Sequence, residues 1–577
     1  MKKRILSALL AAMMMFTMVG CGETEDNGGG GGGGGSTTRP TGTSITIYTG
    51  GSSEFIWTKG SKEEEILDYI EQKYFDETGV SLDFNVSFLG QDMKTKLQSA
   101  LSGGDPVDIA VSHTRGGDGM DDWMIKYDGF YDLSDDIEEY GPNVYDAFSK
   151  PLDGSISSAL DAVTTSENKV VGIPSVISPY KFGILVRKDR MEAVGYTDDE
   201  EKAGTLCAAT NSNYILVDNL EDFTAMCIAI NRKFDKNYAV SGAIWDIEKA
   251  LSLGAFGNSG QYTYAVDAEN QMIRGGASFD YYLDVIKTEY DWAVNGVISK
   301  DADAILKEDA EQAFYSGASS VFVLDPTVTH LIQVARNCKA VNAEAEFTVL
   351  GALREKRDPA ACKYFRKNAD GTDKLDADGN KIPMKGFMRN TQATFCASVL
   401  KTSQNTVKIM KFLNWVYKNA DNYNLCRYGR EGIDWINNGD GTYSYPNESY
   451  ATNPPYSGIL TLVENQNMSN LIYKGYTEEE LSWLATAADP DNYVENDVID
   501  YLLPENSTMG APVASAANNL RAGVLVPAWK GNTDPMTEGG KEFTSKANAL
   551  RDATRTFGGM RYQAYLTMKK ARQERAK

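Results

Sequence analysis

Three short apolar stretches decide the fold: residues 45 to 48 read ITIY, residues 80 to 86 read VSLDFNV, and residues 106 to 111 read PVDIAV. Each has the length and the β-branched or aromatic content of a strand, and the second alternates apolar and polar residues. We expect three strands here. The chain between successive strands is long enough to hold one helix each time, so the order is β-α-β-α-β.

Two helices are expected between these strands. Ser61 and Glu64 form an S-x-x-E capping box, and the helix that it opens stops at Gly79. One face of this helix carries apolar side chains at three- and four-residue spacings, namely Ile66, Tyr69, Ile70 and Tyr74. A second helix is marked by Met93, Leu97 and Leu101. Strands that alternate with such helices predict a parallel sheet, whose ligands bind at the carboxyl ends of the strands.

The first forty residues indicate export and lipid attachment. Lys2, Lys3 and Arg4 precede an apolar run at residues 5 to 20, and Cys21 follows at once. Sixteen apolar residues are fewer than the roughly 20 of a spanning helix. We therefore expect a signal peptide at residues 1–20 and a lipid anchor on Cys21. Residues 21–40, with eight consecutive glycines, form a flexible tether.

Charge and composition argue against nucleic-acid binding and against two kinds of enzyme chemistry. The formal net charge is −23, and −26 without the three basic residues of the leader, so the surface repels nucleic acid. His113 and His330 are the two histidines of the chain, which makes triad and zinc-hydrolase chemistry improbable. The six cysteines other than Cys21 include no C-x-x-C pair. Their even number permits disulfides, but buried free thiols are the simpler interpretation.

Three further elements are expected later in the chain. Residues 183–190 (GILVRKDR) belong to a second apolar-strand region, and a helix starts near Leu220. Residues 366–386 are polar and turn-rich, which predicts a surface hairpin.

A family resemblance also rests on segments further along the chain. Residues 167–176 (ENKVVGIPSV), 182–195 (FGILVRKDRMEAVG) and 219–223 (NLEDF) resemble the hinge-crossing region of extracellular solute-binding proteins of ABC importers, in the sugar-binding branch. Other segments match that family in the same order: SGGDPVDIAV (102–111), AFYSGASSVFVLDP (313–326) and VKIMKFLNWVY (407–417). YGREGIDW (428–435), with the hairpin sequence NNGDGTYSYP (437–446) behind it, is similar to a large lipoprotein subfamily associated with oligosaccharides.

The resemblance implies a two-lobed α/β fold of type II, with a hinge between the lobes that shuts around a ligand. Lobe 1 would take residues 41–183 with 390–430, and lobe 2 residues 184–389. Residues 431–577 would pack across the lobes. It also implies a monomeric carbohydrate receptor, held by its lipid on the outer face of the cell membrane, that serves an ABC permease. We expect no catalytic residue, cofactor, metal or nucleic-acid partner.

Sugar sites combine aromatic plates with carboxylate, amide and guanidinium groups. Candidate contacts are such residues in loops near the ends of expected strands or in the segments that carry the resemblance. They are Trp57, His113, Arg115, Tyr180, Trp245, Asp325, Arg430, Glu431 and Trp435. Structural alternatives stay open: a rim or core position for Trp57, core packing for Trp245, a solvated loop for His113 and Arg115, a helix cap for Asp325, and a hairpin role for residues 430–435.

Three other interpretations were weighed. A calcium loop at Asp376, Asp378 and Asn380 fails because Lys381 and Phe387 stand where glycine and glutamate are required, and DADGNK fits a tight turn. A tethered glycoside hydrolase would need a carboxylate pair, and the sequence marks no particular pair among its 80 acidic residues. A receptor for a peptide or another non-sugar solute shares the fold and stays open.

Overall fold

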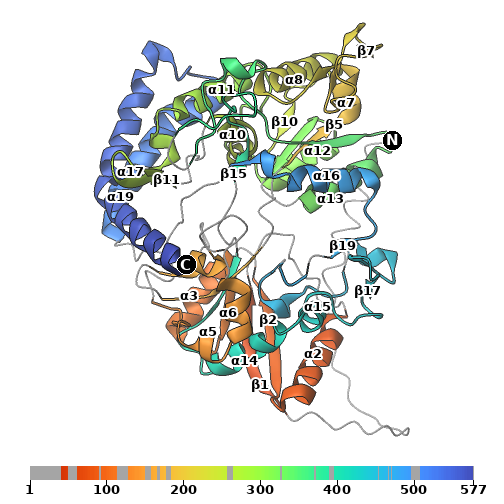
Figure 1. Ribbon diagram of the computed structural model, residues 1–577, viewed down its shortest axis with the longest axis vertical. Coiled ribbons are helices and arrows are strands. Elements are labelled where there is room, and N and C mark those ends of the chain that lie inside the picture. The colour runs from red at the N-terminus through yellow and green to blue at the C-terminus, as the bar shows by residue number, and fades with distance from the viewer. Residues whose placement is uncertain are drawn as a thin grey trace. The chain divides into compact units, whose positions relative to one another are not determined.

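The structure is a computed structural model. It describes residues 41–49, 62–89, 92–113, 128–149, 158–165, 169–176, 183–256, 264–324, 328–368, 372–388, 395–451, 454–465, 467–469, 471–494 and 507–575. Two main sheets organise these residues (Figure 1). One apolar core packs on the first sheet and two pack on the second.

The first sheet confirms the predicted β-α-β-α-β unit. Strand β1 (Thr43–Thr49) pairs in parallel with β2 (Leu82–Phe88) and with β3 (Ile109–His113). Two later strands complete the order β2-β1-β3-β16-β4. Strand β16 (Phe395–Val399) runs antiparallel to both β3 and β4 (Ile173–Pro174). The expected parallel pairing holds for β1, β2 and β3. The whole sheet is mixed, because β16, which lies in the returning segment 390–430, enters it antiparallel to β3.

Helix α2 (Glu63–Thr78) ends at Gly79 as predicted, in the left-handed conformation at φ 70°. Ser61 of the expected capping box lies outside the described residues, and Lys62 holds the N-cap position without a side-chain hydrogen bond. Ile66, Ile70 and Tyr74 are buried, but Tyr69 is 46% exposed, so its assignment to the apolar face is wrong. Instead, the guanidinium carbon of Arg430 lies 5.9 Å from the centroid of the Tyr69 ring.

The remaining helices of the first half also surround its sheet. Besides α2, the helical segments are α3 (Met93–Gly103), α5 (Asp136–Glu139), α6 (Pro142–Ser149), η3 (Ala159–Val163), α14 (Thr406–Val416), α15 (Ala420–Tyr428), η7 (Glu448–Ala451) and η8 (Ile459–Thr461). Helix α14 confirms the helix expected in the VKIMKFLNWVY segment. Its Phe412 packs edge-on to Tyr74, with ring centroids 5.2 Å apart, and thereby joins α14 to α2 in one core.

The second sheet has the order β10-β13-β5-β14. Strand β5 (Gly183–Arg187) runs antiparallel to β13 (Val321–Leu324) and β14 (Phe347–Leu350), and β10 (Val240–Ser241) pairs in parallel with β13. The apolar segment expected at residues 183–190 is thus a strand only as far as Arg187, because Lys188 begins helix α7. All five residues of β5 are buried, as its apolar composition requires.

Helices and helical turns surround the second sheet. Helix α8 (Leu220–Phe234) begins where predicted, capped by the Asn219 side chain, which accepts a hydrogen bond from the Asp222 amide. The others are α7 (Lys188–Ala193), α9 (Ile244–Ile247), η4 (Glu248–Ser252), α10 (Leu253–Phe256), η5 (Gly276–Ser278), α11 (Tyr282–Val294), α12 (Lys307–Tyr315), α13 (Val328–Val341), η6 (Pro359–Ala361), α16 (Glu478–Ala488), η9 (Pro490–Asn492), α17 (Ser507–Leu520), η10 (Arg521–Leu525), α18 (Val526–Trp529), η11 (Thr537–Gly539) and α19 (Lys541–Arg575).

Each half also contains short sheets of two or three strands. They pair β6 (Tyr196–Thr197) with β9 (Ile215–Leu216), β7 (Leu206–Cys207) with β8 (Ser212–Asn213), β11 (Tyr264–Asp267) with β12 (Met272–Gly275), and β15 (Phe387–Met388) with β20 (Tyr493–Val494); β17 (Ile436–Asn437), β18 (Thr442–Ser444) and β19 (Ile472–Tyr473) form a three-stranded sheet. The expected hairpin in the polar segment 366–386 is confirmed by antiparallel bridges such as Leu375 to Lys381. Its DADGNK turn has Gly379 at φ 83°.

The C-terminal segment contributes to both cores. Tyr456, Ile459 and Leu460 belong to the core of the first sheet. Trp483 and Ala487 join the core on β5, β13 and β14, and residues from Leu520 to Leu550 join the other core of the second half. The six described cysteines are buried and free, which confirms the interpretation as buried thiols. Within the described residues, no helix combines the length and the apolar character that crossing a bilayer requires.

Candidate functional site

Most of the predicted ligand contacts follow strands of the two main sheets. Trp57, Arg115, Tyr180 and Asp325 lie outside the described residues. His113 is the last residue of β3, paired in register with Phe395 of β16, so its backbone is at the carboxyl end of a central strand. That is the edge at which α/β sheets bind ligands. Whether these side chains contact a ligand remains a prediction.

Trp245 lies in the one-turn helix α9, which follows β10 in the second sheet. Its side chain is half-buried and packs against the core of the second half. This contact fits the structural alternative of core packing. The part of the indole that stays exposed is the part available to a sugar.

Side chains of the turn at residues 428–435 stabilise it by hydrogen bonds within the turn. The Asp434 carboxylate is fully buried and accepts hydrogen bonds from the Arg430 amide and from Arg430 Nε, at 2.9 and 2.8 Å. Arg430 Nη1 reaches Glu65 of α2 at 2.6 Å. The hydrogen bond with Asp434, followed by that with Glu65, raises the pKa of Arg430 above its ordinary value. Arg430 is therefore committed to holding this turn against α2.

The two other predicted residues of the turn differ in exposure. Trp435 is 2% exposed, and its indole N–H donates to the Gly429 carbonyl at 2.9 Å. Glu431 is exposed, and its backbone bridges to that of Trp435. These contacts fit the structural hairpin role for Arg430 and Trp435, because their polar groups bond within the turn and to α2. Of the three, only Glu431 has a side chain open to a ligand.

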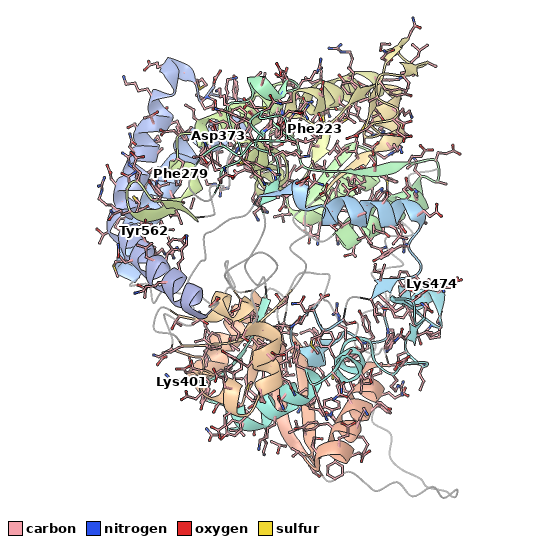
Figure 2. The ribbon with its side chains drawn as sticks, in the orientation of Figure 1. Phe223, Phe279, Asp373, Lys401, Lys474 and Tyr562 are labelled. Carbon is pink, nitrogen blue, oxygen red and sulfur yellow. The ribbon has the colours of Figure 1, made fainter. Side chains whose placement is uncertain are left out.

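We predict that Asp434→Ala lowers the free energy of unfolding by about 3 kcal/mol, because it leaves the poorly exposed Arg430 cation without its buried partner. The midpoint of urea unfolding measures this loss. Lys401→Ala is the matched control, since the Lys401 side chain is 54% exposed and its partner Asp128 is 83% exposed. Figure 2 labels Lys401. The control should change stability by less than about 1 kcal/mol. Equal losses in the two variants would contradict the structural role of Asp434.

Sequence reasoning missed a group of tyrosines, which we call the tyrosine cluster: Tyr428, Tyr443, Tyr445, Tyr450, Tyr473 and Tyr476. Their rings form one network across the β17–β18–β19 sheet. Tyr443 lies at its centre, with its centroid 4.9 Å from Tyr428 and 5.5 Å from Tyr473. All six are half-buried. The signal in the sequence is the density of tyrosine between residues 428 and 476, which no helix or strand period explains.

Burial raises the pKa of tyrosines in this cluster. Desolvation is the main reason that the pKa of Tyr445 and that of Tyr476 each rise to about 12, and burial raises that of Tyr443 further. The Arg427 guanidinium lies at the edge of the cluster, 5.9 Å from the Tyr428 ring centroid and 3.0 Å from the Glu464 carboxylate. The cluster is thus an apolar unit with one compensated ion pair beside it.

The raised tyrosine pKa values predict a loss of stability at alkaline pH. An unfolded tyrosine releases its proton near pH 10 and the folded one near pH 12, so the free energy of unfolding falls from about pH 10 upward. A Tyr445→Phe/Tyr476→Phe variant should lose less stability between pH 9.5 and pH 11.5 than the unchanged protein, in urea titrations. Cysteines titrate identically in both proteins and cancel. If the free energy of unfolding falls equally with pH in the two proteins, the pKa values of these two tyrosines are not raised by folding.

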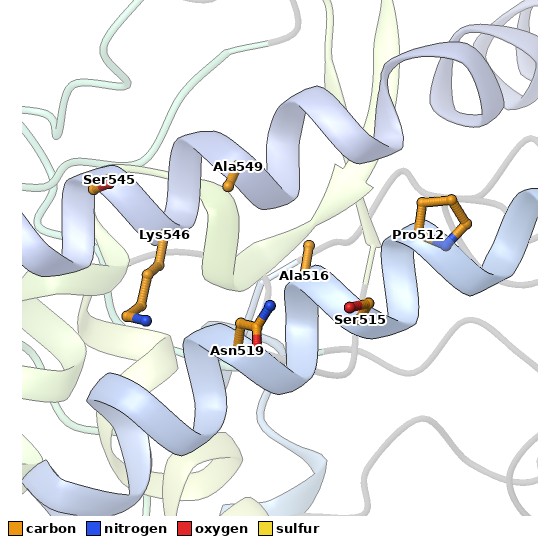
Figure 3. A pocket seen from close by; sticks show the side chains of 7 residues that line it. All are labelled: Pro512, Ser515, Ala516, Asn519, Ser545, Lys546 and Ala549. Carbon is orange, nitrogen blue, oxygen red and sulfur yellow. The ribbon is translucent and has the colours of Figure 1, made fainter.

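A hollow of about 420 Å³ lies between α17 and α19 (Figure 3). Its lining is Pro512, Ser515, Ala516, Asn519, Ser545, Lys546 and Ala549. No aromatic ring lines it, so it lacks the flat apolar surface on which a sugar stacks. We do not assign it to a ligand. Among the described residues, no group of three or more His, Cys, Asp or Glu side chains is placed to hold a metal ion.

No family model matches the chain, and no curated protein matches its sequence. Solved structures do match its fold. The N-glycan transport solute binding protein NgtS from Streptococcus pneumoniae is 15% identical, with 91% of this chain and 99% of that chain covered and a TM-score of 0.58. An HMO-binding, ABC-transporter-associated solute binding protein from Bifidobacterium longum infantis is 12% identical, with coverage of 91% and 98% and a TM-score of 0.57.

The ABC-transporter substrate binding protein FusA from S. pneumoniae, solved in complex with kestose, is also 12% identical. It covers 91% of this chain and 100% of its own length, with a TM-score of 0.57. The chain is therefore similar in fold, over 91% of its length, to these solute-binding proteins of ABC transporters. It has their two-lobed α/β fold of type II, which confirms the predicted fold class.

Proposed function

We propose that this protein is the substrate-binding component of an ABC importer that captures an oligosaccharide and delivers it to a membrane permease. The observation that carries the proposal is the fold: a sheet of order β2-β1-β3-β16-β4 and a second α/β half, similar to oligosaccharide-binding proteins over 91% of the chain. The segments that resemble the sugar-binding branch support the same conclusion from the sequence.

In this proposal the ligand contacts come from both lobes. Trp57, His113, Arg115 and Tyr180 serve from the first lobe, and Trp245 and Asp325 from the second. Glu431 adds an exposed carboxylate from the turn after α15. A ligand that touches both lobes favours the closed form, because only that form offers all contacts at once. The protein breaks no bond of the sugar, so it is a receptor and not a glycoside hydrolase.

In this proposal the leader and the tether keep the receptor at the membrane. Cys21 carries the lipid after removal of residues 1–20, and residues 21–40 join it to the folded body. The body then stays beside the outer face of the membrane, where it meets both the solute and the permease. The nineteen glycine-rich residues after Cys21, 22–40, reach roughly 24 Å, which lets the body tumble on its anchor.

A thermal-shift screen of residues 37–577 tests the proposal; residues 42–577 form one compact unit. We expect one class of oligosaccharide to raise the unfolding midpoint, because a ligand that binds only the native state stabilises it by RT ln(1 + [L]/Kd). At 100 times Kd the gain is about 2.7 kcal/mol. Mono- and oligosaccharides of several linkages make up the panel, together with short peptides.

Reducing-end assays on the same samples separate the alternatives. A midpoint rise without new reducing ends supports the receptor and identifies its ligand class. Release of reducing ends would make the protein a glycoside hydrolase. A rise with peptides alone would keep the fold and replace the ligand class, and no rise with any sugar would contradict carbohydrate binding.

Trp57→Ala and Trp245→Ala should each weaken binding of the sugar that gives the largest midpoint rise. Loss of one aromatic stacking contact costs about 0.5–1.5 kcal/mol, which corresponds to roughly 2- to 12-fold in Kd. Titration calorimetry measures the change. Trp57→Phe and Trp245→Phe are the matched controls because they keep a ring, and Leu206→Ala changes an exposed side chain elsewhere. Unchanged affinity in both alanine variants would place the site at other residues.

A further inference from the structure

Part of α19 has a charge opposite to that of the rest of the chain. From residue 553 to residue 573 the helix contains no acidic residue. Over the same span it contains five basic ones: Arg555, Arg561, Lys569, Lys570 and Arg572. The whole chain has a net charge of −23, so the residues outside this span sum to −28. We call residues 553–573 the basic segment of α19.

One face of the basic segment packs on the β11–β12 hairpin (Figure 1). A Cβ added at Gly558 would lie 2.4 Å from the Ile273 carbonyl oxygen of β12, so the helix approaches this strand closely. Tyr565 and Ile273 form a small apolar core at the same contact. Thr554 and Phe557 are buried on this side as well. These contacts fix which face of the helix is covered.

The opposite face of the basic segment is open to solvent. At 3.6 residues per turn its exposed side chains fall within about 140° of the helix circumference. They include Arg555, Met560, Gln563, Leu566, Thr567 and Lys570. Met560 is 55% exposed and Leu566 is 40% exposed, so two large apolar side chains lie on the same face as two cations.

This combination indicates which anionic partner the face fits. A soluble polyanion would pair with Arg555 and Lys570 but would leave Met560 and Leu566 in water. An anionic lipid surface accommodates both kinds of side chain, because its phosphates attract the cations and apolar side chains enter between its headgroups. The open face therefore favours an anionic lipid surface over a soluble polyanion.

The acidic remainder of the chain does not prevent this contact. At an ionic strength of 0.1 M the Debye length is about 10 Å, so acidic groups further than that from the lipid are largely screened. Asp552, just before the basic segment, already forms an ion pair with Arg555 at 3.3 Å. A weak attraction is enough, because the proposed lipid on Cys21 holds the body near the membrane at a high effective concentration.

We propose that the basic segment of α19 docks the folded body on an anionic lipid surface. Arg555 and Lys570 then lie on the phosphates, and Met560 and Leu566 lie among the headgroups. Docking limits the tumbling that the tether allows and gives the body one orientation on the membrane. The assignment to a membrane rests in part on the lipid anchor of the proposed function, but the contact does not depend on any sugar.

Co-sedimentation of residues 37–577 with lipid vesicles tests the proposal. This form lacks the anchor, and its apolar cores all lie within residues 45–565. Vesicles of phosphatidylcholine with phosphatidylglycerol should bind the protein in about 0.1 M salt and release it in about 1 M salt, where the Debye length is about 3 Å. Vesicles of phosphatidylcholine alone should bind far less protein.

Removing two cations from the open face should weaken binding. Arg555→Gln/Lys570→Gln should lower partition onto the anionic vesicles by roughly 5- to 25-fold, since each Lys or Arg near such a surface contributes about 5-fold. Lys541→Gln/Lys401→Gln is the matched control, because it removes the same charge from side chains that are 81% and 54% exposed. Lys541 begins the same helix, about 44 Å from Lys570 at 1.5 Å per residue. The control should change partition by less than about twofold.

A second variant tests the apolar contribution. Met560→Ser/Leu566→Ser should weaken partition several-fold in about 0.1 M salt and leave the release by salt in place. Thermal unfolding midpoints equal to that of the unchanged protein verify folding, which the exposure of all four substituted residues favours.

Three outcomes would overturn the proposal. Equal losses in the Arg555/Lys570 variant and the lysine control would mean that net charge, and not this face, governs binding. Equal binding to both kinds of vesicle would remove the role of anionic lipid. Binding to soluble polyphosphate without binding to vesicles would make the partner a soluble polyanion. A protein that binds no sugar but binds anionic vesicles through this face would refute the proposed function and support the docking surface.

Discussion

The pairing of β16 with β3 and β4 is the constraint on which the rest of the structure depends. The first sheet is complete only when residues 395–399, which follow the whole second sheet in the chain, return to it. The approach is close: a Cβ on Gly172 would lie 2.6 Å from Ser398 Oγ, and Ser398 Oγ donates to the Val171 carbonyl at 2.5 Å. Neither half is therefore a continuous piece of sequence, and the chain must cross between them more than once.

The segment that follows Glu464 and ends at Glu480 joins the first core to the second and shows how such a connection is stabilised. A partly buried ion pair holds each end, Arg427 with Glu464 before it and Arg336 with Glu480 at its close. Buried pairs of this kind contribute little net stability but cost much when one partner is lost, so they specify geometry more than they add free energy. Between them, the tyrosine cluster supplies apolar contact and keeps each ring half-buried.

The local patterns of the sequence were good predictors of local structure. Apolar runs gave β1, β2, β3 and β5, and the N-cap Asn219 and the terminal Gly79 set the ends of two helices. Errors arose where tertiary contacts compete with periodicity: Tyr69 has the spacing of a buried residue but lies beside Arg430 at the surface. The candidate site was predicted from residue type and strand position alone. That reasoning selected Trp435, which the fold buries, and passed over the tyrosines that gather only when β18 and β19 pair.

The sequence by itself determined the β-α-β-α-β beginning of the first sheet, the second strand region and the resemblance that implied a two-lobed binding fold, because hydrophobic period, caps and turn residues act over a few neighbours. It also contains the leader, the tether and the charge of −23. Only the tertiary structure decided which strands close each sheet, which cores the C-terminal segment joins, and where the tyrosine cluster gathers. Many of these contacts join residues far apart in the chain, as Arg336 and Glu480 do across 144 positions. No local pattern encodes the energy gained when distant surfaces are buried together.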